Sequence, residues 1–378
     1  MPLIRTIEDL QTLARRRVPK MFYDYAQGGS WTESTSRANL ADLSKIQFRQ
    51  RIGVNIEKRN LATQIVGQSA AMPVVLGPIG MCGLQRADGE ILAARAAEAS
   101  GVPFCLSTMS ICSIEDLAQH VRQPFWFQLY IMRDRSFVEK LIMRAHDAKC
   151  TVLIVTMDLQ ILGERHKDLR NGLAAPPKLT PQFMLDLLLR PHWALEMLQT
   201  RRRGFGNIVG HVSGVKDMAS LSAWTTAQFD PSVTWEDVAW IRKLWKGKLI
   251  IKGVMDSEDA RKAIDAGADG LVISNHGGRQ LDGAPSSISV LPQIKKAVGA
   301  DTELLFDGGV RSGQDVLRAL ALGAHGVLLG RAYLYGLGAL GQEGVRLCLE
   351  IIERELSLTL GFCGRTDVRS VDETIVVL

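Results

Sequence analysis

The chain has 378 residues, of which 46% are hydrophobic and 22% charged, and its formal net charge is +5. This composition is typical of a soluble globular protein with a sizeable core. The small net charge, with no basic stripe interleaved with aromatic residues and no zinc-ligand spacing, excludes a dedicated nucleic-acid binder and predicts no metal site.

The cysteines and the N-terminus indicate the compartment. The first ten residues already carry charges, so they lack the apolar core of a signal peptide. No apolar run approaches the roughly 18 residues of a transmembrane helix. The six cysteines form no C-x-x-C pair and several lie in apolar segments. We therefore expect reduced, buried thiols in a cytoplasmic protein rather than a disulfide framework.

Residues 1 to about 60 are polar and predict a helical segment that precedes the main domain. The stretch from Pro19 to Tyr25 is followed by Gly28 and Gly29. Tyr23 and Tyr25 are two positions apart and cannot share one face of a helix, so at least one should point away from the local packing.

From Met72 onward, short apolar runs alternate with turns and helical segments, and there are eight such runs. They are Val74–Gly77, Phe104–Ser107, Trp126–Tyr130, Val152–Asp158, Leu249–Gly253, Leu271–His276, Leu304–Gly308 and Val327–Arg331. Strands that alternate with helices pair in parallel, and eight such units predict a closed (β/α)₈ barrel over residues 72–362. An open doubly wound sheet is the alternative, but it does not require eight units. The whole chain, 1–378, is then one domain, with 341–362 as its last helical region and 363–378 as surface structure.

A long insertion, about 163–235, separates the fourth and fifth predicted strands. It contains a leucine-rich run from Phe183 to Leu189, a break at Pro191, Trp193 and the basic cluster 201–203. Insertions this long are often functional. Apolar residues beside arginines favour an anionic membrane surface at about 176–215, and packing of a helical pair on the barrel or on a neighbouring subunit explains the same pattern equally well.

In a barrel of this type the chemistry lies at the carboxyl ends of the strands, and these ends are unusually polar here. The last two strands are followed by glycine-rich turns, 307–313 and 329–332, whose backbone N–H groups and following helix N-termini form an anion site. No Rossmann or Walker A sequence is present, so the phosphate belongs to FMN or to a phosphorylated substrate. Lys252 ends the fifth run, where a lysine either reaches out to water or places a cation beside a cofactor.

The stretch from Ser274 to Asp282 follows the apolar residues 270–273 and carries the strongest chemical signal. His276 supplies a base that titrates near neutral pH, and Arg279 supplies a planar fork that matches a carboxylate. Gly277 and Gly278 allow a sharp turn between them. Asp158, at the end of the fourth run, is either an orienting partner for an imidazolium or a turn cap.

Together these segments resemble the FMN-dependent α-hydroxy acid dehydrogenases and oxidases. The resemblance rests on the Ser-Asn-His-Gly-Gly-Arg-Gln stretch, on Pro19–Tyr25 and Trp126–Tyr130, and on the turns at Asp307 and Gly330, and it covers almost the whole chain. The closest likeness is to bacterial membrane-associated L-lactate dehydrogenases, through 106–108, 133–135 and the long loop.

The resemblance implies a role for each matching residue. His276 is the expected base with Asp158 as its partner, Tyr130 the partner of the substrate hydroxyl, and Arg279, Tyr25 and Arg165 the clamp of the substrate carboxylate. Lys252 is the expected cation at the N1–C2=O edge of the flavin. Ring and ribityl contacts of FMN fall on Pro78, Ile79, Gly80, Ser107, Gln128, Thr156 and Ser274. The ribityl and phosphate site falls on Asp307, Gly308, Gly309, Arg311, Gly330 and Arg331.

The implied reaction is oxidation of an L-2-hydroxy acid, with L-lactate first, and transfer of electrons to quinone or another membrane-side acceptor. Gly80, where the oxidases tend to carry Ala, and Met109, where glycolate oxidase has a large aromatic residue, favour this over an oxidase that makes hydrogen peroxide. A barrel that binds FMN without catalysis is a third reading. The family habit implies a homotetramer, peripheral on the inner face of the cytoplasmic membrane.

Overall fold

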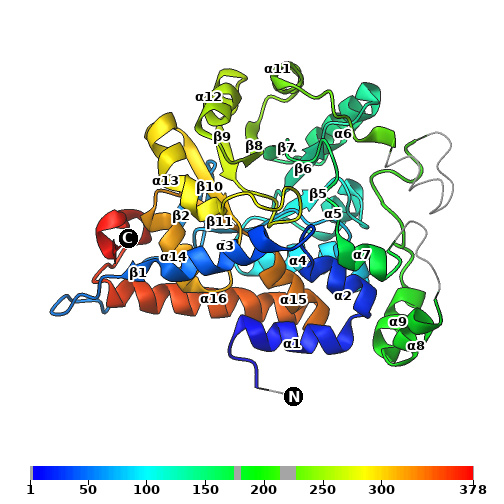
Figure 1. Cartoon of the computed structure of the whole chain (residues 1–378), viewed down its shortest axis with the longest axis horizontal. Helices are drawn as coiled ribbons and strands as arrows, with labels where there is room; N and C mark the ends of the chain where they lie inside the picture. The colour runs from blue at the N-terminus through cyan, green and yellow to red at the C-terminus, as the bar shows by residue number, and fades with distance from the viewer. Residues whose placement is uncertain (1–2, 174–179, 213–226, 378) are drawn as a thin grey trace.

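Eight parallel strands form a closed ring in this computed structural model, which describes residues 3–173, 180–212 and 227–377 (Figure 1). The ring runs in chain order from β4 to β11, and β11 pairs with β4. An N–H of Leu76 bonds the carbonyl of Pro103 at 2.9 Å, and Leu76 pairs with Phe104, which closes the ring between β4 and β5. The strands are β4 (Val74–Leu76), β5 (Cys105–Ser107), β6 (Trp126–Tyr130), β7 (Val152–Thr156), β8 (Lys248–Val254), β9 (Gly270–Ile273), β10 (Glu303–Asp307) and β11 (Gly326–Leu329).

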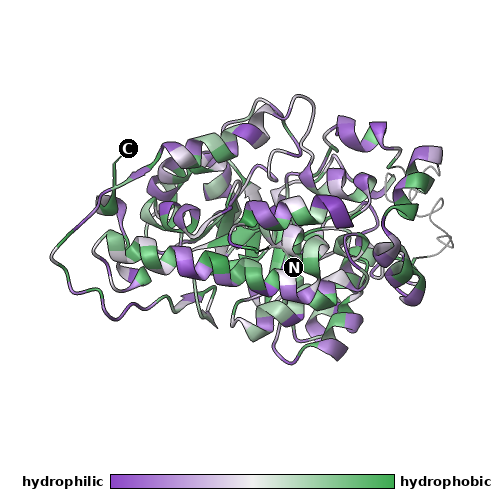
Figure 2. Ribbon diagram, turned by 90° about the horizontal axis from the view of Figure 1, so that it is seen from below, coloured by the Kyte–Doolittle hydropathy of each residue, from purple (hydrophilic) through white to green (hydrophobic). Residues whose placement is uncertain are grey.

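A helical layer surrounds this ring, and at least one helix follows each strand. Several of these helices begin at side chains that cap them, such as Ser113, Asp134, Thr234, Asp256 and Ser312, because these oxygens accept the first free backbone N–H groups. The hydrophobic residues concentrate in the strands and on the helix faces turned toward them (Figure 2). The helices are α4 (Gly89–Ala99), α5 (Ile114–His120), α6 (Arg135–Asp147), α11 (Trp235–Leu244), α12 (Ser257–Asp265), α13 (Ser287–Val298), α14 (Gly313–Ala321), α15 (Arg331–Leu340) and α16 (Gln342–Phe362).

The predicted barrel is confirmed, and every apolar run chosen from the sequence overlaps one of its strands. Five of the runs extend past the strand at the carboxyl end; the sixth run, for example, ends at His276 whereas β9 ends at Ile273. These extra residues are the turns that carry polar side chains.

The N-terminal segment is helical only as far as Lys45, so the prediction of helix to about residue 60 is wrong for its last part. The helices are α1 (Ile7–Arg17), α2 (Lys20–Gln27) and α3 (Ser34–Lys45). Beyond them β1 (Gln47–Phe48) pairs with β12 (Val376–Val377) of the C-terminal tail, and the N–H of Arg49 bonds the carbonyl of Ile375 at 2.7 Å. The chain is extended there because its backbone groups are paired with the tail, not within a helix. The tail also contains η2 (Val368–Ser370) and η3 (Glu373–Ile375).

A short hairpin that was not predicted closes the amino-terminal end of the barrel. It consists of β2 (Thr63–Ile65) and β3 (Gln68–Ala70). Ile65, Val66 and Ala70 form one buried cluster with inward-facing residues from all eight strands. The indole N–H of Trp126 bonds the Gln68 side-chain oxygen at 2.8 Å, which fixes the hairpin to the barrel interior.

The insertion after β7 contains α7 (His166–Arg170), α8 (Pro181–Leu188) and α9 (Pro191–Gln199), while its residues 174–179 and 213–226 lie outside the described part. α8 and α9 pack on α2, and α9 is also tied to the loop after β4, because the Trp193 indole N–H donates to the Leu84 carbonyl at 3.0 Å. The ring of Phe22 meets Phe183 at 6.1 Å, edge to face, and stacks on Trp193 at 5.3 Å.

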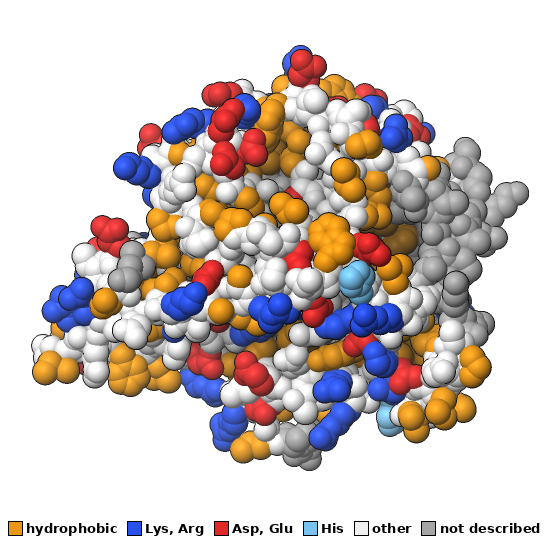
Figure 3. All heavy atoms as spheres, viewed as in Figure 1, with side chains coloured by type: hydrophobic (Ala, Val, Ile, Leu, Met, Phe, Trp, Pro, Cys, Tyr) orange, Lys and Arg blue, Asp and Glu red, His pale blue; other side chains and the backbone are white. Residues whose placement is uncertain are grey.

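The outer side of α8 and α9 is apolar. Leu188, Leu189 and Leu198 are 77%, 70% and 70% exposed. In Figure 3 hydrophobic side chains gather over this corner of the molecule, beside a group of Lys and Arg side chains. No helix in the described ranges is long and apolar enough to cross a membrane. All six cysteines are free and buried, as expected.

Candidate active site

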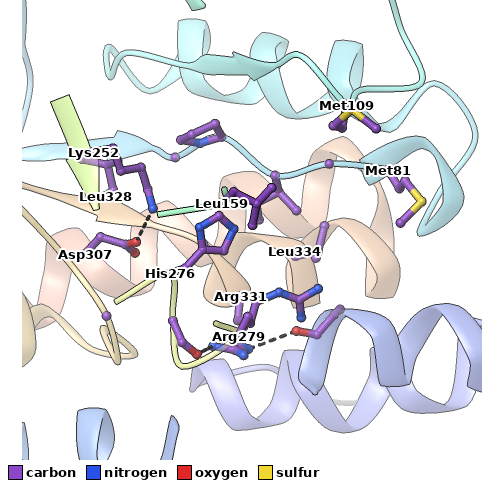
Figure 4. Close-up of a pocket in the computed structure, with 18 of the residues that line it drawn as sticks. Met81, Met109, Leu159, Lys252, His276, Arg279, Asp307, Leu328, Arg331 and Leu334 are labelled. Carbon is purple, nitrogen blue, oxygen red and sulfur yellow. Dashed lines mark hydrogen bonds and ion pairs between the residues drawn. The ribbon is translucent and has the colours of Figure 1, made fainter. Parts of the chain in front are cut away.

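A cavity of about 270 Å³ opens at the carboxyl ends of the strands, and polar residues from different strands converge on it. β9 leads to His276 and Arg279, β8 carries Lys252, and β10 ends at Asp307. Figure 4 shows His276 between Lys252 and Asp307 on one side and Arg279 and Arg331 on the other, with Met81 and Met109 farther out. The structure therefore brings together residues that lie far apart in the sequence.

His276 and Asp158 form a hydrogen-bonded pair. Nδ1 of His276 lies 2.9 Å from Oδ1 of Asp158. A carboxylate only accepts hydrogen bonds, so Nδ1 carries the proton and the Nε2 lone pair is free to accept another. Gly253 makes room for this carboxylate, since a Cβ there would lie 2.7 Å from the Asp158 side chain.

The backbone at His276 is strained. Its φ of 56° lies in the left-handed region, where a non-glycine residue costs about 1–3 kcal/mol. Its N–H donates to the Ser274 hydroxyl at 3.0 Å, and Gly277 and Gly278 continue the turn with φ of 65° and 72°. A Cβ on Gly278 would lie 2.5 Å from the backbone nitrogen of Ser36, so this loop lies directly against the start of α3.

For both His276 and Asp158, burial shifts the pKa in one direction and the partner residue shifts it in the other. Burial lowers the pKa of His276, and the Asp158 carboxylate opposes this only in part. For Asp158, burial favours the neutral acid, but the neighbouring His276 and Lys252 together outweigh it and lower the pKa of the carboxyl. At neutral pH the pair is a neutral imidazole held by a carboxylate, which is the arrangement of a base.

Arg279, Arg165 and Tyr25 gather on one wall of the cavity. The guanidinium of Arg279 lies over the Tyr25 ring at 4.7 Å, and that of Arg165 at 5.8 Å. Arg165 is held by Asp168 at 2.7 Å, whereas Arg279 donates to the carbonyls of Tyr25 and Gly28. Among the described residues no carboxylate forms an ion pair with Arg279, so its charge is available to an anion in the cavity.

Tyr130 ends β6 and lines the same cavity. Burial raises its pKa, which keeps the hydroxyl protonated and able to donate. Its ring meets Phe229 edge to face at 5.9 Å.

The strand ends on the side of His276 away from Arg279 carry polar groups that fit a flavin. Nζ of Lys252, a residue only 5% exposed, bonds the Ser274 hydroxyl at 2.9 Å and lies 3.3 Å from the Asp307 carboxylate. Nε2 of Gln128 and Oγ1 of Thr156 are buried with no partner among the described residues. Such groups are costly to bury alone, so they are expected to bond a ligand. The Ser107 hydroxyl donates to Gln128 Oε1 at 3.0 Å and fixes the amide with its N–H₂ left free.

The turns after β10 and β11 fit a phosphate. Gly308 and Gly309 have φ of 131° and 88°, and a Cβ on Gly309 would lie 2.4 Å from the carbonyl oxygen of Asn39. Gly330 faces open space and precedes α15, a helix of ten residues whose N-terminus favours an anion. Arg311 lines the cavity here and lies over the Tyr335 ring at 5.6 Å.

Arg331 lies at this cavity, and its guanidinium also holds the backbone around it. It donates to the carbonyls of Ala26, Gly28 and Gly277, and so ties the end of α2 to the His276 loop. Burial, with Arg279 nearby, lowers the pKa of Arg331 to about 10. An anion placed beside these two arginines would relieve their repulsion.

Pro78, Ile79 and Gly80 line the cavity at the end of β4, and the Tyr25 hydroxyl donates to the Gly80 carbonyl at 3.4 Å. Pro78, Ile79, Met81 and Met109 were identified from the sequence, but most of the other apolar lining residues were not. They come from the loop after β7, from the insertion and from α15, and no periodicity marks them as lining residues. They include Leu159, Leu162, Phe205, Phe229 and Leu334.

Comparisons with known proteins identify the family of this chain. The model of the family described as FMN-dependent dehydrogenase matches residues 14–378. The L-lactate dehydrogenase of Pseudomonas syringae pv. syringae (strain B728a) is 43% identical over 376 residues, 99% of each chain. That of Caulobacter vibrioides (strain NA1000 / CB15N) is 44% identical over 378 residues, 99% of this chain and 98% of the relative.

Solved structures match over the same length. A monotopic membrane protein, (S)-mandelate dehydrogenase, superposes with a TM-score of 0.95 at 37% identity, covering 99% of both chains. A soluble mutant of the membrane-associated (S)-mandelate dehydrogenase from Pseudomonas putida has a TM-score of 0.84 at 35% identity, again over 99% of both. The resemblance read from the sequence motifs is confirmed, and this chain belongs to the FMN-dependent dehydrogenase family.

Proposed function

We propose that this protein oxidises an L-2-hydroxy acid, L-lactate first, to the 2-oxo acid and passes the electrons to quinone or another membrane-side acceptor. The observation that carries the proposal is that one cavity holds both a neutral imidazole bonded to a carboxylate and Arg279, which has no carboxylate partner among the described residues. A 2-hydroxy acid offers the complementary groups, namely a carboxylate and, one bond away, a carbon and hydroxyl that lose protons on oxidation. The L-lactate dehydrogenases among the relatives support lactate as the first substrate.

Each polar side chain on the Arg279 side of the cavity then has a role in binding or oxidising the substrate. The substrate carboxylate binds Arg279, with Arg165 and the Tyr25 hydroxyl beside it. The Tyr130 hydroxyl, protonated by virtue of its raised pKa, bonds the substrate hydroxyl. Nε2 of His276 accepts a proton from the substrate, and Asp158 stabilises the imidazolium that results.

The residues on the other side hold FMN. When bound, FMN supplies the two-electron acceptor for the substrate. Gln128, Thr156, Ser107 and Ser274, with the backbone at 78–80, offer hydrogen bonds to its ring and ribityl chain, and Lys252 offers a cation at the N1–C2=O edge. Asp307, Gly308, Gly309 and Gly330, with Arg311 and Arg331, hold the ribityl hydroxyls and the phosphate.

Anaerobic reduction of the bound flavin tests the proposal. L-lactate should bleach the flavin absorbance of the purified holoprotein, and a failure of lactate, glycolate, mandelate and longer 2-hydroxy acids to do so would refute the enzyme class. Hydrogen peroxide formed in proportion to substrate, with turnover faster in oxygen than with quinone analogues, would instead identify an oxidase.

The apolar outer side of α8 and α9 supports contact with a membrane surface. Arg201 and Arg203, which follow α9, are exposed, and Arg203 donates to the carbonyl of Leu198, so basic side chains stand beside these leucines, a combination suited to an anionic bilayer. The contact proposed for about 176–215 includes 176–179 and 213–215, which are outside the described residues. We place the protein peripherally on the inner face of the cytoplasmic membrane, where a quinone acceptor is within reach.

We further propose that the chain works as one domain, 1–378, and assembles as a homotetramer. The pairing of β1 with β12 and the packing of α1 on α15 and α16 tie both ends of the chain to the barrel. Light scattering on the detergent-purified holoprotein would report the mass of four chains, and the mass of a single chain would reject the tetramer.

A further inference from the structure

After α9 the insertion returns to the barrel and forms part of the cavity wall. Arg202 anchors this return, because its guanidinium lies 3.1 Å from Asp88 before α4 and 2.7 Å from Asp116 in α5. Thr200 adds a hydrogen bond of 2.8 Å to Asp88. The segment that follows, Phe205–Ile208, is mostly buried, with Ile208 and Asn207 fully so.

Gly206 brings the two backbones into contact. Its N–H donates to the carbonyls of Ser110 and Ile111, both at 3.2 Å. A Cβ at this position would lie 2.7 Å from the Ile111 carbonyl oxygen and from the Ser113 nitrogen. Only glycine therefore allows the insertion to lie flat on the loop that follows β5.

The Asn207 side chain is the hydrogen-bond centre of this contact. Its Nδ2 group donates to the Ser107 carbonyl at 3.2 Å and to the Ser110 hydroxyl at 3.0 Å, and its Oδ1 accepts from the Ile114 N–H at 2.9 Å. Arg144 donates to the Asn207 carbonyl at 3.0 Å. A buried amide with so many partners holds both segments in one arrangement.

Phe205 is consequently held against the cavity. Its ring is 8% exposed and lines the same space as Met81, Met109, Leu162 and Phe229. The loop that Asn207 grips is the one that carries Met109, whose N–H bonds the Ser107 hydroxyl at 3.1 Å. Met81 and Met109 lie away from Lys252 and Asp307 in Figure 4, on the side left for the substrate.

We propose that Phe205 is a specificity-determining residue, which limits the side chain of the 2-hydroxy acid to a short apolar group, and that Asn207 is the positioning residue that holds it. This inference rests on the proposed function. The carboxylate is fixed at Arg279, so the substituent on carbon 2 extends toward the apolar wall, and a large ring already occupies part of that wall. The insertion thus shapes the substrate pocket in addition to any role at a membrane.

The test compares L-lactate with L-2-hydroxyhexanoate on the FMN-loaded protein and measures the ratio of the two kcat/KM values. Phe205→Ala should shift this ratio toward the longer acid by at least about 10-fold, because one methylene in an apolar pocket changes discrimination by roughly 10- to 200-fold. Phe183→Ala is the matched control: Phe183 is a buried phenylalanine of the same insertion that packs on Phe22, outside the cavity. Its ratio should stay that of the unmodified protein.

A double-variant cycle tests Asn207. Asn207→Ala should shift the ratio in the same direction as Phe205→Ala, and the double variant should shift it no further than Phe205→Ala alone, because both changes act through one ring. Additive shifts, or an unchanged ratio with Asn207→Ala, would reject the positioning role. If that variant does not fold, the Phe205 and Phe183 variants still decide the specificity role. A ratio that Phe205→Ala moves less than about twofold would overturn that role while flavin reduction, and so the proposed function, persists.

Discussion

At the scale of single residues, the site depends on how charge is distributed around His276. The imidazole is buried, which disfavours its charged form, and it faces one carboxylate and the ammonium of Lys252. The Asp158 partner does not raise the pKa of His276 above its ordinary value, so the base is ready at neutral pH. When a proton arrives, the same carboxylate offsets the new charge.

The first prediction concerns this pair. Because its pKa is lowered, His276 stays neutral until the pH falls below the usual histidine range, so flavin reduction should be constant near pH 7 and decline only in acid. Asp158→Asn removes the group that raises the pKa of His276, so the acid decline should move to still lower pH. The rate on the plateau should fall by about 10²- to 10⁴-fold, since the imidazolium loses its partner.

Single-turnover anaerobic reduction, followed by stopped flow from about pH 5 to about pH 9, measures both effects. Asp42→Asn is the control, because Asp42 pairs with Lys45 and accepts from the Ser286 hydroxyl but does not line the cavity. A plateau in Asp158→Asn equal to that of the unmodified protein would show that Asp158 has no part in proton transfer.

The sequence predicts the positions of the polar residues near strand ends well and those of the apolar residues in the cavity wall poorly. Asp158 and His276 follow buried strands by two and three residues, and Lys252 lies near the carboxyl end of β8, so the barrel rule that places chemistry at strand ends finds them. Phe205 and Asn207 stand in an insertion whose path depends on tertiary contacts alone. No local pattern distinguishes Phe205, which lines the cavity, from Phe183, which does not.

At the scale of elements, the glycine turn after β10 shows how close packing and ligand binding share one backbone. Gly308 and Gly309 fit between the strand end and α3, and Asn39 of α3 bonds the side chain of Asn275 from the His276 loop at 2.8 Å. The turn that faces a phosphate is thereby fixed by an N-terminal helix outside the barrel.

The second prediction separates backbone strain from crowding. Gly309→Ala and Gly283→Ala both place alanine at a positive φ, 88° and 85°, at a cost of about 1–2 kcal/mol. Gly283 has no atom within 4 Å of the added Cβ, whereas Gly309 would meet Asn39. Gly309→Ala should lose a further 1–3 kcal/mol or so of unfolding free energy and should retain less FMN.

Urea unfolding of the apoprotein and flavin retained after gel filtration give the two readings. Equal losses of stability in both variants would mean that α3 moves aside easily. FMN retention in Gly309→Ala equal to that in Gly283→Ala would argue against a phosphate at this turn.

The strands and outer helices could be predicted because the spacing of hydrophobic residues and the capping residues of helices are visible in short stretches of sequence. The hairpin β2–β3 could not, because three-residue strands carry too little pattern and are stabilised by the barrel interior that they close. The extended segment after Lys45 was missed for a related reason, since its partner strand lies more than three hundred residues away at the C-terminal end.

At the scale of the whole molecule, the exposed apolar side chains of α8 and α9 form one corner, which distinguishes that side of the protein from the others. The barrel mouth, the insertion and this corner are joined through α2, which carries Tyr25 toward the cavity and packs Phe22 against Phe183 and Trp193. A surface that engages a bilayer there would hold the active site at a fixed distance from it.

The third prediction tests that engagement. Leu188→Asp with Leu198→Asp replaces two side chains that are 77% and 70% exposed, so folding should be unaffected. Each leucine transferred into lipid contributes about 1.5–3 kcal/mol, and the partition coefficient should fall by at least about 10-fold per substitution.

Sedimentation with vesicles that contain phosphatidylglycerol measures the partition. Met143→Asp is the control, because Met143 is 63% exposed on α6 and lies outside the corner. Equal binding of all three proteins would mean that α8 and α9 do not touch lipid, and flavin reduction by substrate in solution should remain in each.

The return of the chain to the barrel at 200–208 has a practical consequence for the design of a shortened form of this protein. Excision of the entire insertion would discard Arg165, Phe205 and Asn207 along with the leucines, so the shortened protein would lose part of the carboxylate clamp as well as its selectivity for the substrate side chain. A deletion confined to 181–199, with the chain rejoined before Thr200, removes α8 and α9 with their exposed leucines. It leaves the part of the insertion that lines the substrate pocket in place.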